Sequence, residues 1–494
     1  MSDTKNSYRQ VMKATSLFGG VQVINIIISL VRSKAIALLI GPVGMGIASL
    51  LTSTMSLING LTNLGLEKSA VKEISLENSK SDINKVSRTI SILKRLVWFT
   101  ITLGVVVMIV FSPWLSEFAF GNKDYTISFV WISIALLFKQ LASSQLAILQ
   151  GLRKLKSLAK ANLYGNFIGL IITLPLYYFY KLDAIVPAII IATFMSFIFT
   201  LYYSLKLEIK PDKITNKEAF VEGKPMIELG LTLSFSSMVT LLVAYILQIF
   251  ISTEGGIDQV GLYQAGFLIL NSYVGIIFNA MGTDYFPRLS AISEDIVKIR
   301  KSVYEQAMIA VLLISPIIVI FLTLAPIIIR ILYTKEFLSI VPMVSWGILG
   351  MLFRAVSWSM GYIIIAKGDS KVFIKTALGF NSLLLLLNVL GYTYGGLEGL
   401  GFSFFIHYII HFIVIRLITY YRYGFYFEKG FYKIFTFTVI LCALAFSFTY
   451  IQNEILKYSL MGIVIIISIL FSYKLLDEKM DIKKFINELL NRKK

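Results

Sequence analysis

The chain has 494 residues, 57% of them hydrophobic, a mean hydropathy of +0.78 and a net charge of +18. This composition excludes an ordinary soluble protein, whose apolar share is about 45–50%. The single cysteine, Cys442, excludes an intramolecular disulfide and a cysteine-rich metal site.

Apolar segments long enough to cross a membrane recur along the whole chain. About 20 mostly apolar residues are needed to span roughly 30 Å of hydrocarbon as a helix. The sequence therefore predicts an all-α polytopic membrane protein with about fourteen transmembrane helices. The predicted helices cover residues 15–40, 44–66, 92–115, 126–149, 162–180, 184–205, 229–252, 261–283, 304–328, 341–366, 373–393, 398–420, 433–451 and 457–474.

The positive charges are distributed unevenly over the predicted loops. With a cytoplasmic N-terminus, the cytoplasmic segments hold 37 of the 46 Lys and Arg residues. An excess of cations in one set of loops indicates the cytoplasmic side, so we expect both termini in the cytoplasm. Attraction to anionic membrane lipids also fits these loops. They lack the interleaved aromatic residues of a nucleic-acid surface, so we expect no nucleic-acid partner.

A repeat with a constant offset of 217 residues relates the first six predicted helices to the next six. Gly44 and Gly261 open the second and eighth helices. The same offset pairs Gly65 with Gly282, Glu67 with Asp284, Gly151 with Gly368 and Lys154 with Lys371. Because six is an even number, the two copies share one orientation and form parallel repeats.

The repeat predicts the domain organisation. We expect residues 1–205 and 225–420 to form two six-helix lobes around a central cavity, joined by a cytoplasmic linker at 206–224. Residues 421–494 then hold two extra helices and a basic tail.

Four cations lie within the apolar segments: Arg32, Lys34, Lys139 and Arg354. All 28 Asp and Glu residues lie in loops or within a turn or so of a helix end. A charge deep in a bilayer costs roughly 2.5–3.5 kcal/mol on insertion scales, so it is usually kept for a cavity or a substrate path. Cations without acidic partners favour an anionic substrate. The alternative is that they bond backbone carbonyls in helix interfaces.

The repeat pairs the helices of Lys139 and Arg354, and both residues lie near the middle of their spans. Both side chains can donate hydrogen bonds to phosphate, and arginine does so as a bidentate fork. Arg32 and Lys34 are two positions apart, so on a helix they point roughly 200° apart. We expect Lys34 to line the cavity and Arg32 to extend toward the outer interface.

His407 and His411 are the only histidines, and their spacing places them on one helix face. Coupling to protons is one interpretation, because histidine changes charge near neutral pH. The alternative is two neutral imidazoles bonded between helices. With no carboxylate or third ligand nearby in the sequence, we expect no metal site.

No catalytic motif is present in the sequence. It contains no Gly-x-x-x-x-Gly-Lys-[Ser/Thr] stretch for nucleotide phosphates, no paired-carboxylate site and no nucleophile with a base. We therefore expect neither an enzyme nor a bound cofactor.

Five motifs, in order and spacing, resemble the Wzx-type flippases of the multidrug, oligosaccharidyl-lipid and polysaccharide exporter superfamily. They are residues 34–46 (KAIALLIGPVGMG), 121–125 (GNKDY), 150–153 (QGLR), 286–290 (FPRLS) and 346–367. The resemblance covers most of residues 10–420 and is greatest to the branch for O-antigen and enterobacterial common antigen.

The resemblance implies a multi-pass protein of the bacterial inner membrane that moves undecaprenyl-pyrophosphate-linked oligosaccharide. It also implies a cationic central cavity to which basic residues at positions 34 and 354 contribute. A polysaccharide polymerase and a chain-length regulator are the implied protein partners. The two extra helices resemble the lipid II flippase branch, where such a pair cradles the lipid tail.

Two other function classes compete with a flippase. A cation-coupled multidrug antiporter of the same fold would be expected to bury an acidic residue. A non-transporting scaffold for polysaccharide assembly would account for the helices but not for the buried cations.

Overall fold

The computed structural model describes residues 2–80, 82–207, 209 and 212–480. The helices in chain order are α1 (Ser2–Thr62), α2 (Leu66–Ser79), α3 (Ile83–Val110), α4 (Ser112–Phe120), α5 (Thr126–Gly151), α6 (Leu155–Tyr180), η1 (Lys181–Ala184), α7 (Ile185–Leu205), α8 (Asn216–Gly255), α9 (Ile257–Leu268), η2 (Ile269–Val274), α10 (Ile276–Ala291), α11 (Ile296–Leu332), η3 (Lys335–Ile340), α12 (Val341–Ala366), α13 (Ser370–Tyr423), α14 (Lys429–Phe448) and α15 (Glu454–Met480). The prediction of an all-α polytopic membrane protein is confirmed.

Ten helical segments of the described residues are long and apolar enough to cross a membrane. Three of them, Ile24–Thr62, Leu155–Leu205 and Ser370–Tyr423, each contain two of the predicted spans. The predicted span 261–283 is divided among α9, η2 and α10, each too short to be counted alone. These ten segments and this divided helix together account for all fourteen predicted spans.

Glycine breaks divide the two longest helices into paired arms. Gly41 in α1 and Gly396 in α13 have φ angles of 64° and 53°, with non-helical ψ angles. Glycine adopts this region without the steric penalty that a Cβ atom brings. Each helix therefore comprises two membrane-length arms.

Helix ends differ from the predicted spans because caps, not hydropathy, set them. α3 begins at Ile83, where the Asp82 carboxylate accepts a hydrogen bond from the Lys85 N–H at 3.1 Å. α8 begins at Asn216, after a capping box between Thr215 and Glu218. Hydropathy marks only the part of each helix that crosses the hydrocarbon.

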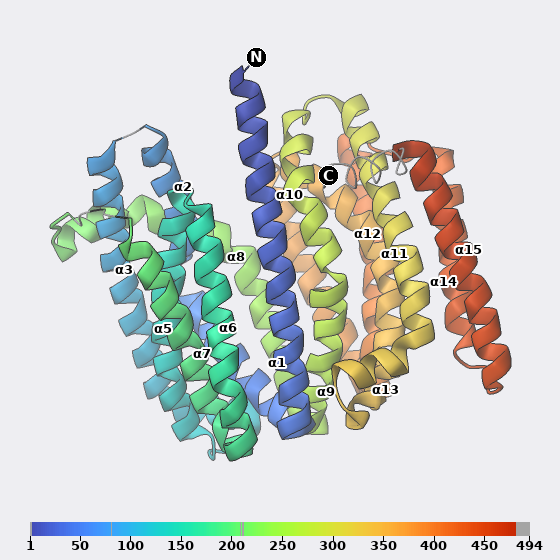
Figure 1. Ribbon diagram of the computed structural model, residues 1–494, viewed down its shortest axis with the longest axis horizontal. Coiled ribbons are helices and arrows are strands. Elements are labelled where there is room, and N and C mark those ends of the chain that lie inside the picture. Colours follow the sequence, from blue (N-terminus) through green and yellow to red (C-terminus); the bar gives the residue numbers. More distant parts are fainter. Residues whose placement is uncertain (1, 81, 208, 210–211, 481–494) are drawn as a thin grey trace, which may run out of the picture. The chain divides into compact units, whose positions relative to one another are not determined.

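The chain folds into two compact units. The first comprises Met1–Gln264 with Leu332–Glu336, and the second comprises Ala265–Ile331 with Phe337–Lys494. In the first unit α7 packs against α5 and α6 (Figure 1), and α8 packs against α1, α2 and α3. α8 therefore belongs to the same compact unit as α1–α7.

Backbone contacts bind the second arm of α1 to α9 within the first unit. A Cβ atom added to Gly46 would lie 1.9 Å from the carbonyl oxygen of Ile257. One added to Gly261 would lie 1.9 Å from the carbonyl oxygen of Pro42. The proposed repeat pairs these two helix starts with each other, and the structure places them in direct contact.

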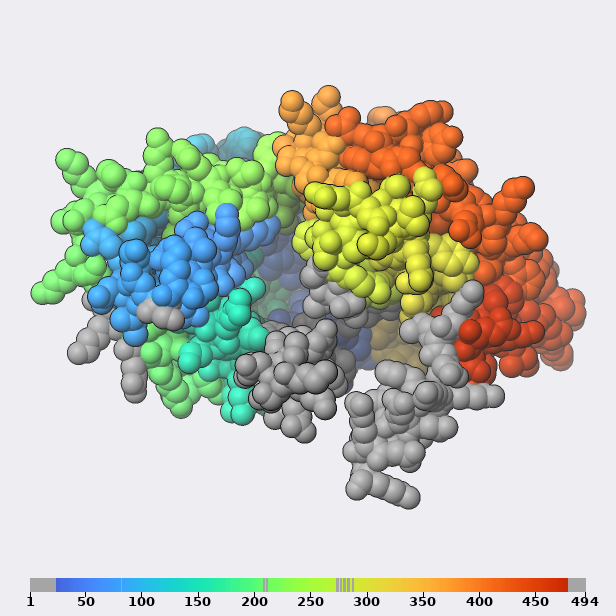
Figure 2. All heavy atoms as spheres, turned by 90° about the horizontal axis from the view of Figure 1, so that it is seen from above, coloured from blue at the N-terminus to red at the C-terminus, as the bar shows by residue number. Residues whose placement is uncertain are grey.

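A charged cluster fastens the start of α8 to α3. The Arg88 guanidinium donates to both carboxylate oxygens of Glu222, at 2.7 and 2.6 Å, and to Asp212 at 3.3 Å. The Asp212 N–H donates to the Ser91 hydroxyl at 2.9 Å. Figure 2 shows the blue end of α2 and α3 beside the green start of α8 on this face.

In the second unit, the two arms of α13 form a hairpin. A Cβ atom on Gly399 would lie 1.9 Å from the carbonyl oxygen of Gly391. At the far ends of the arms, Arg422 Nε donates to the Asp369 carboxylate at 2.6 Å, and the Tyr423 hydroxyl donates to it at 3.0 Å. The hydrogen bond from Arg422 holds the pKa of the Asp369 carboxyl below its usual range.

The two extra helices, α14 and α15, pack on the other helices of this unit. Phe435 of α14 contacts Phe353 of α12 and Phe412 of α13, with ring centroids 5.6 Å apart in each pair. The Ser315 hydroxyl of α11 lies 3.4 Å from that of Ser468 in α15. Figure 1 shows α14 and α15 side by side.

Candidate functional site

Arg354 lies half-buried in α12 and is held by an amide side chain. Its Nη1 donates to Asn271 Oδ1 at 2.9 Å and also contacts Met351 Sδ at 3.7 Å. The Asn271 amide nitrogen in turn donates to the Phe267 carbonyl at 3.4 Å, which orients the amide.

The Asn271 side chain is presented by an irregular turn. Asn271 belongs to η2, a π-helical turn between α9 and α10. Single π-helical turns are rare and frequently occur at functional sites. Asn271 was one of several asparagines in the predicted spans, but its pairing with Arg354 depends on this turn and was not predicted.

Two aromatic rings lie near the Arg354 guanidinium. Its carbon lies 5.1 Å from the Phe278 ring centroid and 5.4 Å from that of Tyr408. A cation within about 6 Å of an aromatic centroid is attracted by the ring. Among the described residues, no carboxylate lies within 4.0 Å of this guanidinium.

The available donors of Arg354 suit an anion with several oxygens. Within the described part of the chain, only Nη1 of Arg354 forms hydrogen bonds to the protein. Nε and Nη2 form one edge of the guanidinium, which can bind two oxygens of a phosphate or carboxylate in parallel. The site can therefore bind an anion without breaking the hydrogen bond to Asn271.

His407 and His411 lie near Arg354 but in an apolar environment. The His411 ring is 4.2 Å from the Phe380 ring, and the two imidazole centroids are 6.1 Å apart. In the described part of the molecule, Nδ1 of each histidine is buried and has no hydrogen-bond partner. Their ring contacts fit helix packing, and proton coupling stays a prediction. No group of three metal-ligating side chains occurs among the described residues.

Lys139 in the first unit has an acidic neighbour that the sequence did not predict, although among the described residues the two side chains form no ion pair within 4.0 Å. Lys139 Nζ donates to the Ser56 hydroxyl at 3.0 Å, and the Glu67 carboxylate lies close enough to interact with it electrostatically. The cause is the turn between α1 and α2, where Leu64 and Gly65 have positive φ angles. This turn directs Glu67 back toward α5.

A polar network beside Lys139 was not predicted. The Gln140 amide accepts from the Thr100 hydroxyl at 3.1 Å and donates to the Thr62 hydroxyl at 3.3 Å. It links α1, α3 and α5. The three residues are scattered in the sequence, and only the position of Gln140 next to Lys139 hinted at this contact.

Arg32 and Lys34 contact different elements, as their spacing predicted. Lys34 Nζ donates to the carbonyl of Tyr333, in the short segment Leu332–Glu336. Arg32 Nη2 donates to the Asn166 carbonyl of α6 at 3.4 Å. This contact joins α1 to α6, and the extension of Arg32 toward the outer interface stays a prediction.

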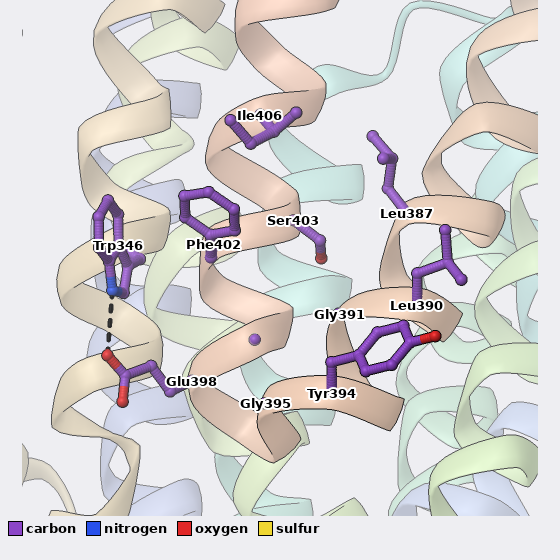
Figure 3. A pocket seen from close by; sticks show the side chains of 11 residues that line it. Trp346, Leu387, Leu390, Gly391, Tyr394, Gly395, Glu398, Phe402, Ser403 and Ile406 are labelled. Carbon is purple, nitrogen blue, oxygen red and sulfur yellow. Dashed lines mark hydrogen bonds between the residues drawn. The ribbon is translucent and has the colours of Figure 1, made fainter.

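A separate pocket of about 490 Å³ lies beside the α13 hairpin (Figure 3). Leu387, Leu390 and Tyr394 line it from one arm, and Phe402 from the other. Trp346 Nε1 donates to Glu398 at 3.1 Å at its edge. None of the four predicted cations lines this mostly apolar pocket, so it is not the anion site.

Comparison with protein families gives one match over more than half of the chain. Residues 35–342 match the model of a family described as polysaccharide biosynthesis protein. Among curated proteins, the chain is 22% identical over 367 residues to the lipid III flippase of Escherichia coli (strain K12), covering 72% of this chain and 85% of that protein. The lipid III flippase of Shigella flexneri matches equally.

Solved structures share the fold. The lipid II flippase MurJ in an inward closed conformation matches with a TM-score of 0.71 at 14% identity, covering 95% of this chain and 99% of that one. An inward-facing multidrug resistance MATE family transporter of the MOP superfamily matches with a TM-score of 0.67 at 14% identity, over 83% of this chain and 96% of that one. At these identities the likeness concerns the fold alone.

Proposed function

The chain belongs to the polysaccharide biosynthesis protein family, and from this premise we propose that it is a lipid-linked oligosaccharide flippase. Its substrate is an undecaprenyl-pyrophosphate-linked oligosaccharide, an O-antigen-like repeat unit. The protein moves this substrate from the cytoplasmic to the outer leaflet of the bacterial inner membrane by alternating access of two parallel repeats. The flippase names of the two curated relatives support this class.

One observation carries the proposal: the Arg354 guanidinium, half-buried within a membrane helix, keeps two donors available for an anion. A pyrophosphate offers oxygens in the geometry that this edge of the fork recognises. Retaining a charge inside a membrane segment without an ion-pair partner is costly, which favours a functional role.

The other predicted cations have secondary roles in this proposal. Lys34 adds positive charge to the substrate path from α1, and Lys139 does so from α5. Arg32 instead holds α1 against α6 through the Asn166 carbonyl. The sugars are recognised by amide and hydroxyl groups along the same path.

Deleting the gene in a bacterium that carries it tests the proposal. Deletion of a flippase should abolish surface polysaccharide, as measured by surface labelling of intact cells. The lipid-linked oligosaccharide should accumulate on the cytoplasmic side, as measured by lipid extraction. Unchanged surface polysaccharide in the deletion strain would contradict the proposed function.

A cation-coupled multidrug antiporter is the second candidate. The Glu67 carboxylate beside Lys139 gives such a pump an acidic group near the spanning helices, and MATE transporters share the fold. This candidate predicts greater sensitivity of the deletion strain to cationic drugs, with normal polysaccharide.

We assign α15 to the polyprenyl tail of the substrate. Many of its apolar side chains are exposed on the protein surface, among them Ile463, Ile466 and Leu470. An exposed apolar face of this kind can contact a tail that stays in the lipid. A protein shortened after Asn453 retains α14, so it should accumulate normally but export less polysaccharide. Undiminished export by this variant would remove α15 from the mechanism.

A further inference from the structure

A second large cavity lies at one end of the second unit. It measures about 810 Å³ and is enclosed by the start of α11, the residues between α13 and α14, and the end of α15. Figure 2 views the end of the unit at which α11 (yellow) and the last turns of α15 (red) lie. The cavity shares no lining residue with the Arg354 site.

The floor of this cavity is apolar. It is formed by Met308, Ile309 and Leu312 of α11 and by Leu476 of α15. Met308, Leu312 and Leu476 belong to one buried cluster that joins the two helices. Such a floor fits a hydrocarbon chain.

The rim carries charges of both signs. Three cations, Arg288, Arg300 and Lys301, and two carboxylates, Glu305 and Glu428, line it. Among the described residues, none of these five groups forms an ion pair within 4.0 Å. Opposite charges held in one cavity without pairing suit a ligand that carries both charges itself.

Arg300 is fixed in place at the rim by two hydrogen bonds and an aromatic ring. Its Nη2 donates to the Gly424 carbonyl at 2.6 Å, and its Nη1 donates to the Tyr426 hydroxyl at 3.2 Å. The guanidinium lies 4.0 Å from the Tyr426 ring centroid. Its Nε is buried and has no hydrogen-bond partner among the described residues. The guanidinium contributes its positive charge to the rim, where it can attract an anionic ligand group.

We propose that this cavity binds a membrane phospholipid whose headgroup carries a phosphate and an ammonium. One acyl chain lies on the apolar floor, and the phosphate binds at Arg300 and Lys301. The ammonium binds at Glu305 and Glu428, which would instead repel a purely anionic headgroup. The bound lipid joins α11 to α15 and is separate from the transported substrate.

Charge complementarity excludes the chain's own tail as the occupant. Residues 481–494 follow α15 and hold five Lys and Arg residues against two Asp and Glu residues. The rim already has one more cation than carboxylates. A basic segment therefore fits it poorly.

Native mass spectrometry of the purified full-length protein tests the proposal with two probes, phosphatidylethanolamine and phosphatidylglycerol with identical acyl chains. We expect phosphatidylethanolamine to bind more tightly. Lys301→Gln should weaken binding of both lipids. Glu428→Gln should weaken only phosphatidylethanolamine, by about tenfold, which corresponds to about 1.4 kcal/mol.

Two further variants make the result decisive. Lys298→Gln removes an exposed cation that pairs with Asp295 at 3.2 Å outside the cavity, so it should change neither affinity. Ile309→Trp keeps every charge but fills the floor, so it should weaken both lipids even if a charge variant folds poorly. Tighter binding of phosphatidylglycerol by the native protein, or equal binding by native protein and Ile309→Trp, would overturn the proposal.

Discussion

Arg354→Ala is expected to lower surface polysaccharide strongly while the protein still reaches the membrane. The substitution removes the guanidinium edge that we assign to the pyrophosphate. A hydrogen bond to a charged group contributes about 1.5–3 kcal/mol, so transport should fall by about 10- to 100-fold. Arg354→Lys keeps the charge but loses the fork, so its defect should be smaller. Export is measured as surface polysaccharide per amount of membrane protein in a deletion strain.

Arg416→Ala is the matched control. Arg416 is exposed on α13, with its guanidinium 5.0 Å from the Tyr432 ring, and lies outside the Arg354 site. Arg416→Ala removes the same charge as Arg354→Ala but leaves the Arg354 site intact, so export should persist. Full export by Arg354→Ala would exclude Arg354 from the mechanism.

Gly399→Ala is expected to destabilise the α13 hairpin strongly. Its new Cβ atom would lie 1.9 Å from the Gly391 carbonyl oxygen, so the two arms must separate. Overpacking of this kind typically lowers the free energy of unfolding by about 1–3 kcal/mol. Here the new Cβ atom meets a backbone carbonyl, which cannot move aside by rotating as a side chain can. The melting temperature of the purified protein in detergent should fall.

Gly395→Ala provides the control four residues away in the same hairpin. A Cβ atom at Gly395 meets no atom within 4 Å, and Figure 3 labels Gly395 among the residues that line the pocket. In a helix, alanine is more stable than glycine by about 1 kcal/mol, so this variant should melt at the melting temperature of the native protein or above it. Equal melting temperatures of the two variants would contradict the close approach of the α13 arms.

The membrane-crossing helices could be predicted from sequence because burial in hydrocarbon demands long apolar segments. The amphipathic helix α2 was missed because it lies in a charged stretch, and only its packed face, with Leu66, Ala70 and Ile74 buried, makes it stable. Its position is set by tertiary contacts that hydropathy does not record.

The candidate site was predictable in part. Arg354 stands out because it is charged and lies in an apolar segment, whereas its partner Asn271 is distant in sequence and reaches it through a π-helical turn. Glu67 was correctly placed near a helix end, but its approach to Lys139 depends on the backbone turn at Leu64 and Gly65. The chemistry of single residues could therefore be predicted from the sequence, whereas the contacts between those residues could not.

Reconstitution into liposomes tests the proposed function most directly. The purified protein is incorporated into vesicles with undecaprenyl-pyrophosphate-linked oligosaccharide, and an enzyme added outside modifies only the sugars that reach the outer leaflet. The flippase account predicts protein-dependent movement of the substrate between leaflets, reduced about 10- to 100-fold by Arg354→Ala. Absence of that movement, together with exchange of an organic cation for protons or sodium by the same vesicles, would contradict it.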